Sequence, residues 1–241
     1  MIAHANRRQF LGGAAAGGGL LLTACASGPT GTASKDEAAA KDESGEEEEV
    51  SPAEDLMREH GVLKRVLLIY REGIARIDSK QEIPPEPLVG SANLIRTFIE
   101  DYHEKLEEEH LFPRFRKAGR LVELVDELEL QHQRGRDLTA TIQRMATAIS
   151  LQDAANRAEL RNALHLFVRM YEPHEAREDT VLFPALRKIV SPNEYAALGE
   201  DFEEKEHELF GEEGFEKNVE QVAGYEKALG LYDLSKFTPP A

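Results

Sequence analysis

Apolar side chains recur every three or four positions along most of the chain beyond residue 50. Leu63, Leu67, Tyr70 and Ile74 show this spacing in the first such stretch. Residues three or four apart lie on one face of an α-helix, whereas a half-buried β-strand alternates with a period of two. No stretch of the sequence alternates in that way. The pattern therefore predicts an all-α protein.

Prolines and glycines divide this pattern into five predicted helices. Ser51 and Pro52 are typical of a capped helix start, and the prolines between 84 and 87 are expected to break the chain after the first helix. The other helices are expected at about 89–117, 121–149, 154–190 and 193–210. Long amphipathic helices joined by short links favour an up-down-up-down four-helix bundle. We expect the bundle domain to occupy 53–210 and a short additional C-terminal helix and tail to occupy 211–241.

The first 25 residues are typical of a targeting segment and are set apart from the fold. Arg7 and Arg8, followed by Gln-Phe-Leu, resemble the twin-arginine export motif. The Gly- and Ala-rich stretch after them is shorter than the roughly 20 residues that a transmembrane helix needs. It ends in Leu-Thr-Ala and Cys25, which resembles the lipidation signal of bacterial lipoproteins. We therefore expect 1–25 to be a twin-arginine lipoprotein signal peptide that ends at a lipidated Cys25.

Residues 26–52 are mainly small or charged and show no apolar periodicity, which predicts a disordered acidic linker. With a lipid on Cys25, this linker would tether the domain to the periplasmic or extracytoplasmic face of a membrane in the cell envelope. The alternative is a disordered leader with a chance pair of arginines. The formal net charge of −16 and the scattered basic residues argue against nucleic acid as a partner. The sequence names no protein partner.

Each of the four predicted bundle helices carries a histidine on its apolar face, where a core leucine would be expected. These residues are His60, His103, His132 and His174. A single histidine in such a position is more often a hydrogen-bonded core residue than a ligand. Four of them, one on each helix, would be costly to bury together without a compensating charge. The pattern therefore indicates one shared site inside the bundle.

Two of these histidines open a repeated segment. Residues 103–117 read HEKLEEEHLFPRFRK and residues 174–188 read HEAREDTVLFPALRK, so 8 of 15 positions are identical at an offset of 71. Packing in a bundle requires shared apolar spacing, but it does not require a shared His, Glu and Leu-Phe-Pro. In each copy a glutamate, Glu107 or Glu178, lies four residues after the histidine and therefore on the same helix face. The repeat indicates a common chemical task.

The residue types indicate a metal site. Inward-facing histidines and glutamates from four helices are how bundles hold a pair of iron ions. Imidazole and carboxylate ligands without a thiolate suit iron, zinc or manganese. Cys25 is the single cysteine of the chain, so no cysteine-based metal site and no intrachain disulfide can form.

With these residues, the chain from about 53 to 210 resembles the hemerythrin, or HHE cation-binding, domain. The resemblance implies a non-haem di-iron centre in which two carboxylates and an oxo or hydroxo group bridge the two iron ions. It implies the following ligands: His60 and His103 on one iron, His132 and His174 on the other, with Glu107 and Glu178 as the bridges.

One position departs from the oxygen-carrying members of that family, which have a second histidine four residues after the first on the third helix. This chain has Arg136 there, so the second iron would lack a protein ligand. Glu104 is a candidate replacement, and water or a substrate is the alternative. His110, two turns beyond His103, is a further candidate for a ligand or for a neighbour of the ligands. Glu104 and Glu175 each lie next to a predicted ligand, and simple solvation is the alternative interpretation for both.

The resemblance leaves three functions open. The first, which we favour, is a binding protein that binds or senses oxygen or a related small oxidant, either a diatomic molecule such as nitric oxide or a peroxide. The second is a di-iron enzyme, namely a peroxidase, an oxidase or a nitric oxide reductase. The third is a structural or iron-storage bundle. The twin-arginine route fits a metalloprotein because it exports folded chains that can be loaded with iron beforehand.

Overall fold

The computed structural model describes residues 50–240, and among these residues helices and turns form the whole structure, which confirms the all-α class. Helix α1 (Pro52–Asp78) begins at the expected place. The Ser51 hydroxyl accepts a hydrogen bond from the backbone N–H of Glu54 at 3.3 Å. Pro52 occupies the first turn, where its missing N–H costs no helical hydrogen bond.

We call each of the four long helical runs of the bundle a rod, and α1 is the first. The second rod is one helical run that contains two π-helical segments, in which the turns are wider than in an α-helix. It consists of α2 (Pro85–Leu94), π-helical Ile95–His103, α3 (Glu104–Leu106), π-helical Glu107–Leu111 and α4 (Phe112–Ala118). The run begins four residues before the expected position because Pro85 opens α2 instead of lying in a break. Proline is well tolerated there, since the first N–H groups of a helix have no intrahelical acceptor.

The third and fourth rods end earlier than expected. They consist of α5 (Val122–Met145), α6 (Ala154–Arg177), π-helical Glu178–Leu182 and α7 (Phe183–Leu186). Between α5 and α6 lies a short 3-10 turn, Ser150–Gln152, where the sequence pattern predicts the end of the third helix. None of the helices in the described part of the chain is both long and apolar enough to cross a membrane.

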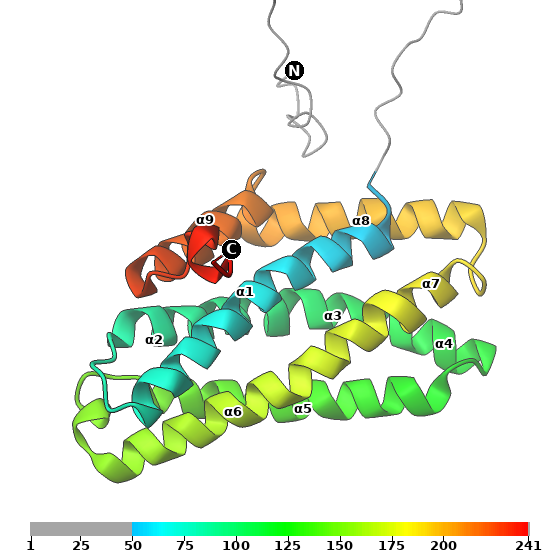
Figure 1. The fold of residues 1–241 in the computed structure, drawn as a ribbon. Coiled ribbons are helices and arrows are strands. Elements are labelled where there is room, and N and C mark those ends of the chain that lie inside the picture. The colour runs from blue at the N-terminus through cyan, green and yellow to red at the C-terminus, as the bar shows by residue number, and fades with distance from the viewer. Residues whose placement is uncertain (1–49, 241) are drawn as a thin grey trace, which may run out of the picture. The chain divides into compact units, whose positions relative to one another are not determined.

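The four rods pack into a bundle in which α1 lies against α6 and α2 lies against α5 (Figure 1). Two further helices, α8 (Pro192–Phe210) and α9 (Gly214–Leu229), pack against each other on one side of the bundle, next to α1. Helix α9 also packs against α2, and a 3-10 turn, Leu234–Phe237, follows it. The whole segment from Val50 onward is one compact unit, so α9 is part of the packed structure.

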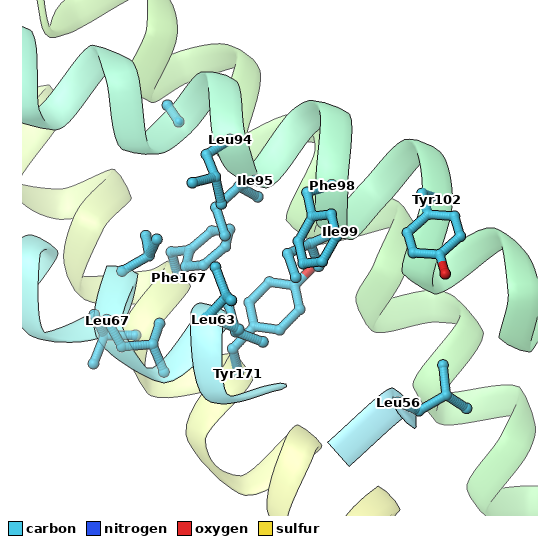
Figure 2. Packing of buried hydrophobic residues seen from close by; sticks show 14 of the residues in the cluster. Leu56, Leu63, Leu67, Leu94, Ile95, Phe98, Ile99, Tyr102, Phe167 and Tyr171 are labelled. Atoms are coloured by element: carbon cyan, nitrogen blue, oxygen red, sulfur yellow. The ribbon is translucent and has the colours of Figure 1, made fainter. Parts of the chain in front are cut away.

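The core is built from apolar and aromatic side chains that all four rods contribute. Figure 2 shows Leu63 from α1 and Phe167 from α6 facing the π-helical segment that carries Phe98 and Ile99. All four side chains are buried. Tyr171 extends from α6 toward the same segment.

The contact between α2 and α9 depends on a glycine. A Cβ atom at Gly90 would overlap the ring of Tyr225 on α9. We therefore expect Gly90→Ala to lower the free energy of unfolding by about 1–3 kcal/mol, because an overpacked contact must shift one helix or one ring. Thermal unfolding measures this change.

The matched control is Gly224→Ala, because Gly224 is also helical but has open space around its Cα. Alanine there should raise the free energy of unfolding by about 0.5–1 kcal/mol through its higher helix propensity. Equal effects of the two substitutions would contradict the packing of α9 on α2.

Candidate metal centre

The structure brings together the six side chains for which the sequence predicts metal binding. They are His60 on α1, His103 at the end of the first π-helical segment, Glu107 at the start of the second, His132 on α5, His174 on α6, and Glu178 at the start of the third π-helical segment. None of the six is more than 3% exposed. They form two groups of potential ligands, each with two histidines and one glutamate.

The repeated segment also repeats its backbone. In each copy a π-helical turn begins at the glutamate, at Glu107 and at Glu178. The N–H of the phenylalanine five residues later, Phe112 or Phe183, donates to the carbonyl of that glutamate. A proline follows each phenylalanine, and a proline ring inside a helix collides with the carbonyl four residues before it. A widened turn accommodates the ring, and such turns occur frequently at functional sites.

In each of the four site histidines, Nδ1 points away from the centre of the site, and we call it the outer nitrogen. It makes a hydrogen bond that fixes the orientation of the ring. For the first pair, His60 Nδ1 lies 2.7 Å from Asp179 Oδ1, and His103 Nδ1 lies 2.7 Å from Glu59 Oε2. Because an ionised carboxylate only accepts, these contacts place a proton on Nδ1. Metal-binding histidines usually have such a partner, which orients the ring and raises its basicity.

For the second pair, the partners differ in charge. His132 Nδ1 lies 3.1 Å from Glu108 Oε1, and His174 Nδ1 lies 2.8 Å from the amide oxygen of Gln131. Both partners again face the outer nitrogen and leave Nε2 directed inward. All four histidines therefore present the same nitrogen to the centre of the bundle.

The inner nitrogens face each other in pairs. His60 Nε2 lies 3.0 Å from His103 Nε2, and His132 Nε2 lies 3.2 Å from His174 Nε2. With the protons on Nδ1, two lone pairs would meet across each of these short distances. A cation that binds both nitrogens of a pair removes this repulsion.

Each glutamate reaches both pairs. Glu107 Oε1 lies 3.9 Å from His103 Nε2, and its Oε2 lies 3.4 Å from His132 Nε2. Glu178 Oε2 lies 3.4 Å from His60 Nε2, and its Oε1 lies 3.1 Å from His174 Nε2. Each carboxylate therefore extends one oxygen to each histidine pair, which is the geometry of a bridge between two metal ions.

The four oxygens of these two glutamates are buried and have no hydrogen-bond donor. Buried carboxylates are costly unless they are paired with a charge or bind a metal. This arrangement fits a site for two cations, because the inner nitrogens of four imidazoles lie around the two carboxylates. The residues present therefore suit the metal pair that the sequence predicts.

Without a metal, protons must balance these charges. Burial lowers the pKa of His60, but its hydrogen bond to Asp179 and the nearby Glu178 outweigh burial and raise it to about 10. Burial and the Glu178 carboxylate raise the pKa of Glu107 to about 8. Burial also raises the pKa of Glu178, but His174 and His60 outweigh that effect and lower it overall. Metal binding must displace the protons that the metal-free site holds.

Glu104 lies outside the two inner groups, but it forms a third group of potential ligands with Glu108 and His132 of the second pair. Its Oε2 accepts a hydrogen bond from Arg136 at 2.8 Å, and its Oε1 accepts one from the Tyr171 hydroxyl at 2.7 Å. Gly135 leaves room for that hydroxyl, since a Cβ atom there would overlap it. Arg136 therefore contacts the carboxylate that is the candidate replacement for the missing ligand.

Two expectations need correction. His110 is half-buried and packs its ring against Phe202 of α8, with 5.5 Å between ring centroids, so it belongs to neither inner group. Glu175 is 3% exposed, not solvated, and one of its oxygens lies 3.9 Å from Lys64 Nζ. The helix turns bring Glu175 inward beside His174, which sequence spacing alone did not show.

Sequence reasoning missed the four partners of the outer histidine nitrogens. Glu59 and Asp179 each lie next to a ligand in the sequence, but each contacts a ligand on a different rod. The available signal was the acidic residue directly beside a ligand. Arg7, Arg8 and Cys25, which the export and lipidation predictions concern, lie outside the described residues.

Comparisons with known proteins agree with this site. The family model described as the hemerythrin HHE cation-binding domain matches the chain twice, over residues 51–155 and 124–237. Each match contains one copy of the repeated segment. Uncharacterized proteins of Mycobacterium bovis and Mycobacterium tuberculosis are 52% identical to the chain over 190 residues, which is 79% of this chain and 74% of each relative. None of the solved structures compared with the chain matches it.

A further buried carboxylate, Glu100, lies one turn before His103 and pairs with Arg96 Nη1 at 2.5 Å. Burial raises the pKa of Glu100 from its ordinary value of 4.5 to about 7. Between these two pH values the unfolded chain loses the proton and the folded chain keeps it. The contribution of Glu100 to stability is therefore present below pH 4.5 and is lost as the pH rises through about 7.

We expect Glu100→Gln to gain stability relative to the unmodified protein as the pH rises from 5 to 8. Melting temperatures of the metal-free proteins across this range measure the gain. Glu72→Gln is the control, because Glu72 also pairs with an arginine but lies partly exposed on α1. A difference that is constant with pH for Glu100→Gln would contradict the buried state of this carboxylate.

Proposed function

The chain belongs to the hemerythrin HHE cation-binding domain family, and on this basis we propose that it is a non-haem di-iron protein that binds or senses oxygen or a related small oxidant. The proposed ligand is a diatomic molecule, such as oxygen or nitric oxide, or a peroxide. The site would hold two iron ions with an oxo or hydroxo bridge between them.

The observation that carries this proposal is the paired reach of Glu107 and Glu178. Each carboxylate directs one oxygen to the His60–His103 pair and the other to the His132–His174 pair. A single metal ion would leave one histidine pair and one oxygen of each carboxylate uncompensated. Two ions satisfy all four inner nitrogens and all four oxygens.

The chain contributes position and environment to such a centre. When bound, the iron pair supplies electrons and a Lewis acid for a small oxidant. The six ligands hold the ions, the outer hydrogen bonds fix the four rings, and the apolar core around them excludes water. Imidazole and carboxylate ligands without a thiolate suit iron, although zinc and manganese share this preference.

A second candidate function is a di-iron enzyme that reduces peroxide, oxygen or nitric oxide. The observation that favours it is the network of Arg136, Glu104 and Tyr171, which runs from a partly exposed guanidinium to a phenol whose ring packs 5.3 Å from that of His174. A guanidinium does not release its proton, so this network would act by fixing the positions of the Glu104 carboxylate and the Tyr171 ring beside the centre. Steady consumption of peroxide or nitric oxide by the reduced protein would select this function over sensing.

We also propose that the protein is exported by the twin-arginine route and anchored to a membrane by a lipid on Cys25. The support is the sequence alone: the paired Arg7 and Arg8, the short apolar stretch, the cysteine at its end and the acidic linker after it. Export in the folded state would allow iron to be loaded in the cytoplasm.

The first prediction concerns metal content. The chain purified without added metal should carry two iron ions, and its near-ultraviolet bands should bleach on reduction and return in air. His103→Ala and His174→Ala should each lose iron, because each removes one inner nitrogen of a different pair. His165→Ala, on the exposed side of α6, is the matched control and should keep the iron.

Absence of iron after anaerobic loading with ferrous ions would overturn the di-iron proposal. A full complement of iron with no response to oxygen, peroxide or nitric oxide would instead select the structural or storage bundle.

A second prediction concerns the anchor. In the native host, Cys25→Ser should move the protein from the membrane fraction to the soluble fraction, because a serine cannot carry the thioether-linked lipid. Replacing both Arg7 and Arg8 by Lys should keep the protein in the cytoplasm. Retention of the Cys25→Ser protein in the membrane fraction would contradict lipid anchoring.

A further inference from the structure

The two histidine pairs differ in what holds their outer nitrogens. On the first pair, both partners are carboxylates at 2.7 Å, Asp179 and Glu59. On the second pair, one partner is the neutral amide of Gln131 and the other is Glu108 at the longer distance of 3.1 Å. A hydrogen bond to an ionised acceptor is shorter and stronger than one to a neutral acceptor, and it makes the imidazole a better electron donor to a cation.

The charge of Glu108 is also shared. Its Oε1 accepts a hydrogen bond from Arg136 at 2.7 Å, and its Oε2 accepts one from Lys105 at 2.5 Å. Two cations thus compete with His132 for one carboxylate. Besides His60, Asp179 pairs with Lys64 at 3.4 Å, and the Lys64 side chain is 53% exposed. Water screens such an exposed pair strongly.

The wider surroundings differ in the same direction. Beyond His103, carboxylate oxygens of Asp55, Glu59 and Glu206 lie within 4.8 Å of one another, and all three residues are buried. Beyond His132, the carboxylates of Glu104 and Glu108 are joined through Arg136. Negative charge near a bound cation stabilises it, and a guanidinium at that distance opposes it.

Gln131 also differs from Glu59 in exposure. It is half-buried and lines a surface groove of about 450 Å³ between α5 and α6, together with Leu138, Leu166, Met170 and Pro173. Glu59, by contrast, is fully buried. Solvent therefore approaches the outer hydrogen bond of His174 more closely than that of His103.

We propose that the two metal positions are unequal: the His60–His103 position binds a divalent cation first and more tightly, and Gln131 and Glu108 leave the His132–His174 position as the weaker, exchangeable one. This inference rests on the proposed two-metal site. It assigns Gln131 and Asp179 as positioning residues that set the order of loading without touching the metal. The position that loads second is also the one beside Arg136, where the sequence lacks a histidine ligand.

The direct test uses the full chain in its metal-free form, with histidine labelled by nitrogen-15 and with zinc alone as a redox-inert probe. At one equivalent of zinc, the ring signals of His60 and His103 should shift, while those of His132 and His174 should keep their metal-free positions until the second equivalent. Simultaneous shifts of all four rings, or the reverse order, would overturn the inference.

A second test changes the partners in opposite directions. Zinc competition with a chelator should show that Asp179→Asn weakens the first binding step by about 10- to 100-fold, as loss of such partners usually does. Gln131→Glu should strengthen the second step by about tenfold or more, because it supplies the missing carboxylate. Gln133→Glu, exposed on the same helix, adds the same charge away from the ring and should change neither step by more than about twofold.

The outcomes separate this inference from the proposed function. Two zinc or iron ions bound with equal affinity, or a Gln131→Glu protein with an unchanged second step, would leave the two-metal site standing and overturn only the unequal loading. A chain that binds no metal would overturn both. The labelled unmodified chain gives the order of loading even if a variant does not fold.

Discussion

The bundle buries the carboxylates of Glu107 and Glu178 between four imidazoles, and the charge of these two side chains constrains the rest of the structure. Their four oxygens have no hydrogen-bond donor, and burial alone would cost each ionised group several kcal/mol. Each of the four rods contributes one histidine whose Nε2 faces these carboxylates. The outer carboxylates and the amide of Gln131 then keep those nitrogens in place.

The backbone follows from the same constraint. Two of the three π-helical segments begin at Glu107 and Glu178, and each of these two is followed by a proline within the next turn of helix. The histidine and the glutamate of each copy are four residues apart and share one helix face, and the widened turn that follows them accommodates the proline. The 15-residue repeat, whose copies are 71 positions apart, therefore encodes a local shape as well as a set of potential ligands.

Helical spacing was sufficient to predict the six inward side chains, because residues on one face of an amphipathic helix must meet in the core of a bundle. It was insufficient for Glu59 and Asp179, whose contacts depend on how closely neighbouring rods approach and rotate. The role of Arg136 was visible only as the loss of a histidine. Arg136 pairs with Glu104 and Glu108 because the second and third rods lie close together there. Helical spacing in the sequence does not predict the distance between two rods.

The central claim is that one cavity of this bundle holds two iron ions bridged by Glu107 and Glu178. X-ray absorption at the iron edge of the loaded full chain tests it most directly. We expect the spectrum to show nitrogen and oxygen ligands, with the scattering pattern of imidazole, and a second iron atom at about 3–4 Å from the first. Iron with no neighbouring iron atom, or with sulfur ligands, would contradict it.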